Sequence, residues 1–223
     1  TNQIARCTLA GAITNSVATT GVSITTVAQS VVGADNNLYM FYNNRVVRVN
    51  SSNAVTDNVM SAPPIDMRIT SVCRYGEYLA IGCAYGTSAT AIPGGRSQIY
   101  IWDLVSTTTA TYVIDWNEGA LMVLGNVEGR LVGVSDEFLS SALGQSRGSM
   151  VVRMWSSGVP QVIKRIVANQ SVTLGRFIRN KVERNGKLYW VASVPYGLST
   201  ATESTFHLGI WSFGRKNENA PFA

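Results

Sequence analysis

A candidate catalytic serine lies in the stretch GQSRG, residues 144–148. Its G-x-S-x-G spacing is that of the sharp turn that exposes a nucleophilic serine between a strand and a helix. In this chain loop-like residues precede Ser146, and the strand-like run SMVVRMW follows it where a helix is required. His207 is the one histidine of the sequence, and no aspartate follows Ser146 to complete a triad with it. The pattern therefore argues against an esterase.

Two pairs of neighbouring acids have the residue type that glycoside hydrolysis uses, Asp115 with Glu118 and Asp136 with Glu137. That reaction needs two carboxyl groups held about 5 to 10 Å apart across a sugar. Adjacent residues of a strand point to opposite faces, and adjacent residues of a loop lie together in solvent. We therefore interpret these acids as turn formers and solvated loop ends, and we expect a protein that is not an enzyme.

The three cysteines, Cys7, Cys73 and Cys83, form no CxxC pair, and one histidine cannot complete a zinc site. The sequence predicts no cofactor and no metal site, although a calcium ion held by loop carbonyls in a central channel stays an open alternative. A turn at Gly76–Glu77 would place Cys73 opposite about residue 80, roughly 10 Å from Cys83 along the strand. We therefore predict that Cys73 and Cys83 are not bonded to each other.

The positive charge of the chain is concentrated in one stretch. Residues 147–187 hold nine basic residues and one acid, whereas the first 146 residues hold seven basic and ten acidic ones. Arg179, Lys181 and Glu183 alternate with Ile178 and Val182, so this stretch is interpreted as the solvated face of a strand.

The alternative is a docking surface for a polyanion or an acidic partner. Its candidate binding residues are Arg176, Arg179, Lys181, Arg184 and Lys187.

Two landmarks repeat in step along the chain. The first ends a strand-like run, as in YIWDL, and lies at Val49, Trp102, Trp155 and Trp211, with spacings of 53, 53 and 56 residues. The second opens an apolar run after a turn residue, and lies at Leu38, Tyr78, Leu131 and Leu188. Units of this length that consist of four short strands are typical of a β-propeller.

The strands themselves support this assignment. They are rich in Val, Ile, Tyr and Trp and are bounded by Gly, Ser and Asn. In QIYIW both faces are apolar, so this strand must be covered on both sides. With 46% hydrophobic and 14% charged residues, a chain of 223 residues can bury such a core. No run of 18 apolar residues suggests a membrane span.

We therefore predict an all-β fold in one domain, residues 1–223: a β-propeller of four-stranded antiparallel blades with about four blades visible. The blade units are 23–62, 66–116, 119–168 and 172–213. Residues 1–20 supply strands of a preceding or closing blade. The last unit supplies three strands, so both a closed four-bladed ring and an arc of a larger ring are open, and we favour the arc.

Trp102 and Asp103 resemble the dipeptide of the WD repeats, but the other units lack the aspartate and no Gly-His pair occurs. The blades built around G-x-L-Y and I-Y-I-W-D, with loops such as YGTSATAIPGGRS, resemble the propeller domains of tailed-bacteriophage tail and nozzle proteins. The resemblance implies a non-catalytic part of the virion that contacts other structural subunits. The alternatives are a propeller that binds cell-surface glycans or a glycan-active hydrolase, and the aromatic residues for stacking on sugar are Tyr85, Tyr196 and Trp190.

Overall fold

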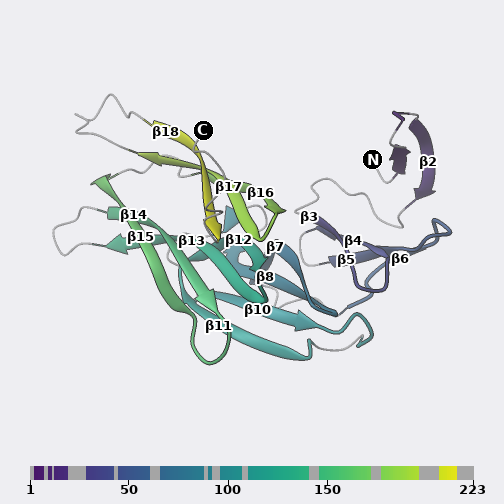
Figure 1. The fold of residues 1–223 in the computed structure, drawn as a ribbon, viewed down its shortest axis with the longest axis horizontal. Coiled ribbons are helices and arrows are strands. Elements are labelled where there is room, and N and C mark those ends of the chain that lie inside the picture. The colour runs from purple at the N-terminus through teal and green to yellow at the C-terminus, as the bar shows by residue number, and fades with distance from the viewer. Residues whose placement is uncertain are drawn as a thin grey trace.

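The structure, a computed structural model, is built from strands and connecting turns in all the residues that it describes (Figure 1). These residues are 3–7, 10–11, 13–19, 29–42, 45–60, 66–87, 90–91, 96–106, 110–140, 146–171, 177–195 and 206–214. Within them there is no helix that could cross a membrane.

Four antiparallel sheets follow one another along the chain, and a separate hairpin precedes them. The hairpin contains β1 (Gln3–Cys7) and β2 (Ile13–Thr19). The first sheet contains β3 (Gln29–Val32), β4 (Leu38–Tyr42), β5 (Arg45–Val49) and β6 (Val55–Thr56). The second contains β7 (Met67–Tyr75), β8 (Tyr78–Thr87), β10 (Arg96–Trp102) and β11 (Tyr112–Glu118), with the short β9 (Thr90–Ala91) beside β8. The third contains β12 (Ala120–Val127), β13 (Arg130–Ser140), β14 (Ser146–Trp155) and β15 (Gln161–Ser171). The fourth contains β16 (Phe177–Arg184), β17 (Lys187–Pro195) and β18 (Phe206–Gly214).

The sheets are the blades of a β-propeller, as the sequence predicts. Each sheet adds its strands in chain order, so its first strand is its innermost. These inner strands contact one another in succession, β3 with β7, β7 with β12 and β12 with β16. In Figure 1 the later strands of the second and third sheets lie successively farther from this centre. The choice between a closed ring and an arc stays a prediction.

The β1–β2 hairpin lies against the first sheet. Ile4 of β1 packs on Met40, Val47 and Val49, which form the face of that sheet opposite to the face covered by the second sheet. Among the described residues, Ile4 is therefore the contact between the hairpin and this face of the first blade.

Trp102 fills the space between the first and second blades, as predicted. Its side chain is 1% exposed, and its ring meets the ring of Tyr39 edge-on at 5.4 Å. Its indole N–H donates to the carbonyl of Ser106 at 2.7 Å. The carboxylate of Asp103 accepts from the backbone N–H groups of Val105 and Ser106. In the Trp-Asp pair, the aromatic ring therefore packs between blades while the carboxylate holds the turn that follows.

Trp155 repeats this arrangement between the second and third blades. Its ring lies 6.4 Å from that of Tyr75 and 6.3 Å from that of Tyr112, and its indole N–H donates to the carbonyl of Gly158 at 2.9 Å. Trp155 is half-buried, whereas Trp102 is buried.

Trp116 is a core residue that the repeat pattern does not single out. Its side chain is fully buried and donates to Ser135 Oγ of the next blade at 3.1 Å. A Cβ atom added at Gly133 would lie 2.4 Å from this ring, so glycine is required there by close packing.

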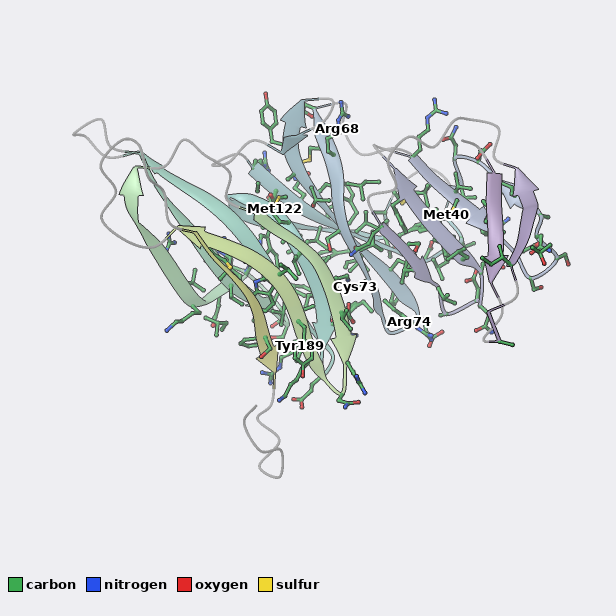
Figure 2. The ribbon with its side chains drawn as sticks, turned by 90° about the horizontal axis from the view of Figure 1, so that it is seen from above. Met40, Arg68, Cys73, Arg74, Met122 and Tyr189 are labelled. Atoms are coloured by element: carbon green, nitrogen blue, oxygen red, sulfur yellow. The ribbon has the colours of Figure 1, made fainter. Side chains whose placement is uncertain are left out.

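The predicted register of the second blade is confirmed. Cys73 pairs with Ala80, and Cys83 pairs with Ile69. Both thiols are free and buried, and Figure 2 shows Cys73 among the side chains between the sheets. Burial raises the pKa of Cys73 to about 12, so its thiol is protonated at neutral pH.

We expect Trp102→Ala to lower the free energy of unfolding by about 3 to 5 kcal/mol, because it leaves a closed cavity against Tyr39. Trp155→Ala is the matched control and should cost less, because part of its ring already contacts solvent. Urea unfolding of the three proteins measures both values. Equal losses for the two variants would contradict a dependence of this loss on how deeply the ring is buried.

Candidate functional site

The inner strands of three blades carry a bulge at the centre of the propeller. A bulge places two residues of one strand opposite one residue of its partner and re-aims the side chains that follow. The register shifts lie between Ile69 and Ser71 in β7, between Leu121 and Val123 in β12, and between Arg179 and Lys181 in β16. The same irregularity therefore recurs in successive blades.

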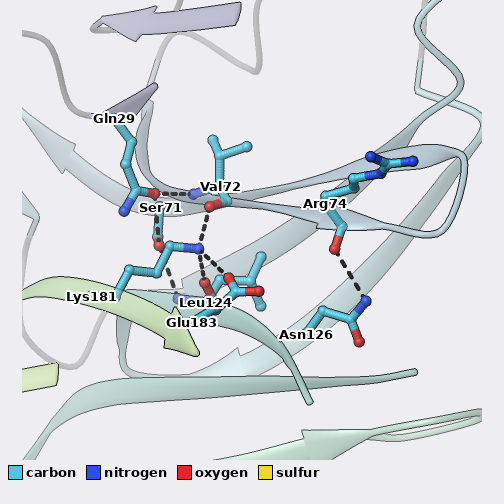
Figure 3. A network of polar contacts seen from close by, with 8 residues as sticks. All are labelled: Gln29, Ser71, Val72, Arg74, Leu124, Asn126, Lys181 and Glu183. Carbon is cyan, nitrogen blue, oxygen red and sulfur yellow. Dashed lines mark hydrogen bonds and ion pairs between the residues drawn. The ribbon is translucent and has the colours of Figure 1, made fainter. Parts of the chain in front are cut away.

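Each inner strand has one edge that no strand of its own sheet covers, and the backbone groups of this edge need hydrogen-bond partners at the centre. An inner strand pairs with its own sheet along one edge, and the backbone groups of its other edge face the neighbouring blades, where burial without a partner is costly. Polar side chains of neighbouring blades supply the partners (Figure 3). We call the residues of this network the hub: Gln29, Ser71, Val72, Leu124, Lys181 and Glu183.

Ser71 and Gln29 connect the first three blades. Gln29 Oε1 accepts from the backbone N–H of Val72 and from Ser71 Oγ, the latter at 3.1 Å. Ser71 Oγ also accepts from the backbone N–H of Leu124 at 2.9 Å. Ser71 is 1% exposed, so its hydroxyl replaces solvent for two neighbouring strands.

Lys181 connects the fourth blade to the second and third. Its ammonium donates to the carbonyl oxygens of Val72 and Leu124 and lies 2.9 Å from Glu183 Oε1. The Lys181 side chain is 9% exposed. A charge this deeply placed is stabilised only when acceptors surround it, and two carbonyls and a carboxylate meet that need.

The hub has the oxygen ligands of a cation site, and the cation is the ammonium of the protein itself. At the carbonyls of Val72 and Leu124 the positive charge is that of Lys181, while the calcium ion that the sequence leaves open stays a prediction. In the described part of the chain, no group of three His, Cys, Asp or Glu side chains is placed to hold a metal.

The interpretation of residues 178–183 as a solvated alternating face is wrong. The bulge in β16 puts Arg179 opposite Val191 but Lys181 opposite Trp190, which breaks the alternation between residues 179 and 181. Val182, expected on the buried face, is 59% exposed. Strict alternation fails here because the extra residue of a bulge shifts the side-chain period by one.

Two of the other candidate binding residues, Arg184 and Lys187, pair with each other where β16 and β17 meet. Arg184 is exposed and Lys187 is half-buried, both beside the β16–β17 turn. Arg179 is placed by its backbone in β16, and Arg176 lies outside the described residues. The Lys181 ammonium donates to carbonyls of the hub, so it does not join Arg184 and Lys187 in a surface patch.

The aromatic residues predicted to stack on sugar differ in their exposure to solvent. Tyr85 in β8 is 42% exposed and can be reached from solvent. Trp190 is 3% exposed and donates to Met150 Sδ at 3.4 Å, so its assignment to a glycan surface is corrected: it is a core residue between the third and fourth blades. Tyr196 lies outside the described residues.

Ser146 has the strand context that the sequence predicts, but the interpretation of the four acids as turn formers and loop ends is wrong, because they lie within strands β11 and β13. Ser146 opens strand β14 and pairs with Ser140 of β13, so no strand-to-helix turn surrounds it. Asp136 and Glu137 are consecutive residues of β13, opposite Met150 and Ser149 of β14. Hydrogen bonds from Gln98 and Arg96 lower the pKa of Asp115, which is exposed and forms an ion pair with Arg96 at 2.9 Å.

No family model and no curated protein matches this chain. Among solved structures it is similar to virginiamycin B lyase from Staphylococcus aureus, with 14% identity, a TM-score of 0.47, and coverage of 85% of this chain and 55% of that one. It is also similar to the WD40 β-propeller domain of Doa1, with 13% identity, a TM-score of 0.40, and coverage of 76% of this chain and 62% of that one. The chain thus spans less than two thirds of either protein.

We expect Lys181→Ala to lower the free energy of unfolding by about 3 kcal/mol, because the carbonyls of Val72 and Leu124 lose their donor. Ethylammonium at high concentration should raise the melting temperature of this variant, because a small ammonium can enter the vacated space. Thermal unfolding with ethylammonium, and with sodium at equal ionic strength, measures the rescue.

The control for this prediction is Arg184→Ala, which removes an exposed basic residue from the same strand. It should change stability by less than about 0.5 kcal/mol and should show no response to ethylammonium. Equal stability of Lys181→Ala and the original chain would contradict the role of Lys181 in the hub.

Proposed function

We propose that this propeller is a non-catalytic structural and binding module of a larger protein assembly. One observation carries the proposal: the polar side chains at the centre are committed to the backbone of neighbouring blades. Gln29, Ser71 and Lys181 together satisfy backbone groups of β7 and β12. A centre used in this way makes the blades a rigid body and leaves the rim and the loops for contacts with partners.

The assembly that we propose is the tail, nozzle or fibre of a bacteriophage particle, where the module would serve assembly or adsorption to the host. The support is the resemblance of its blade sequences and loops to propeller domains of tailed-phage structural proteins. Strands that bury both faces, as Ile99 and Ile101 show on one face and Trp102 on the other, suit a part that must keep its shape under load.

We expect the chain to be an integral component of purified particles. Particles from the native source would be banded by density and washed in 1 M salt, and the chain would then be quantified by mass spectrometry relative to a capsid protein. A constant ratio across the band and after the wash is expected. Recovery of the chain only in the unbanded fraction would overturn the proposal.

The alternative function, binding of a cell-surface glycan, is favoured by one observation, the exposure of Tyr85. An aromatic ring open to solvent can stack on a sugar ring. If this alternative holds, the purified chain should bind a glycan array, and Tyr85→Ala should weaken binding at least about tenfold. Tyr78→Ala, which removes a similarly exposed tyrosine from the same strand, is the control. An array without signal would reject the glycan function and leave the structural one standing.

A further inference from the structure

We propose that the outer edge of β18 pairs with the β18 strand of a second copy of this chain, and so forms a two-fold symmetric dimer with a sheet that continues from one copy into the other. The inference deepens the proposed structural function, on which it rests, by naming a partner and the strand that binds it.

The first support is an unfilled strand position. Among the described strands, β18 pairs with β17 alone, over all nine of its residues, whereas the first three sheets each add a fourth strand. In an antiparallel pair, alternate residues direct their backbone N–H and C=O groups away from the partner. No described strand pairs with these groups on the outer side of β18, which is the position where the first three blades carry their last strand.

The second support is the absence of charge along this edge. The outermost strands of the second and third blades carry charged residues, which discourage pairing with another sheet: Asp115 and Glu118 in β11, and Lys164 and Arg165 in β15. The β18 sequence, FHLGIWSFG, contains no Asp, Glu, Lys or Arg. A long strand edge without such residues is suited to pairing.

The third support is self-complementarity. In an antiparallel pair of two β18 strands centred on Ile210, Trp211 of each copy lies opposite Gly209 of the other, and Phe206 lies opposite Gly214. Each of these aromatic residues thus meets a glycine, and no like charges are brought together. A symmetric antiparallel pair is the geometry that a two-fold axis produces.

The fourth support is access. Ile210 pairs with Val191, so by register it shares a face with Ser212, Tyr189 and Val182. On this face Ser212 is exposed and Val182 is 59% exposed, while Tyr189 is half-buried. The described residues of this face are thus exposed or half-buried and none is fully buried, so a neighbouring sheet can approach it.

The test is a charge exchange at the two-fold axis. The original chain should sediment as a dimer in analytical ultracentrifugation. Ile210→Lys alone and Ile210→Glu alone should each weaken dimerisation at least about tenfold, because like charges then meet at the axis. A one-to-one mixture of the two variants should recover the dimer, which also shows that both variants fold. The control is Val162→Lys, which adds the same charge to the outer strand β15 and should leave the dimer unchanged.

A cross-link provides an independent measurement. In a background with Cys7 replaced by serine, Ile210→Cys should give a disulfide-linked dimer under mild oxidation, whereas Ser212→Cys should not, because the two Ser212 positions would be about 13 Å apart along the strands. A monomeric original chain, or a dimer insensitive to both Ile210 variants, would overturn the proposal. Particles that still incorporate the Ile210→Lys chain would show that the structural function stands without this dimer.

Discussion

The rest of this structure depends on one constraint: the edge of each inner strand that does not pair within its own sheet is buried, and its backbone groups need hydrogen-bond partners. In a single sheet that edge would face water, but the convergence of the blades buries it. Gln29, Ser71 and Lys181 answer this with acceptors and donors for strands β7 and β12. Each such bond contributes about 0.5 to 1.5 kcal/mol net, but leaving the buried backbone group without a partner costs more. The hub therefore stabilises the fold mainly because it leaves none of these buried backbone groups without a hydrogen-bond partner.

The packing between blades follows from the same convergence. Sheets that meet at a narrow centre diverge toward the rim, so the space between them must be filled by side chains of increasing size. The inner strands bury aliphatic side chains such as Ile69, Val72 and Leu124. Trp102 and Trp155 lie on the third strands and reach back to tyrosines of the preceding blade. The turn after each tryptophan closes on its indole N–H, which leaves neither indole donor unpaired.

These two features bear on function through rigidity. The blades are joined by hydrogen bonds at the centre and by aromatic rings farther out, so movement of one blade would disturb both. A body of this kind holds its rim and edges in fixed positions, and partners that contact several blades then bind with little ordering cost. The outermost strand of each blade has an edge that its own sheet does not pair. The outermost strands β11 and β15 contain charged residues, whereas β18 contains none.

The sequence by itself determined the blades, their four-strand units and the register around Cys73, because strand propensity, turn residues and a repeat of about 53 residues are local signals. It also indicated that Trp102 and Trp155 pack between blades. Only the tertiary structure decided where Lys181, Val182 and Trp190 point. A single bulge at Asn180 reverses the alternation on which a sequence-based assignment of faces depends, and nothing in the residue types announces it. The partners of Lys181 are backbone carbonyls of Val72 and Leu124, which have no residue-specific signature, so the hub could not be predicted before the blades were brought together.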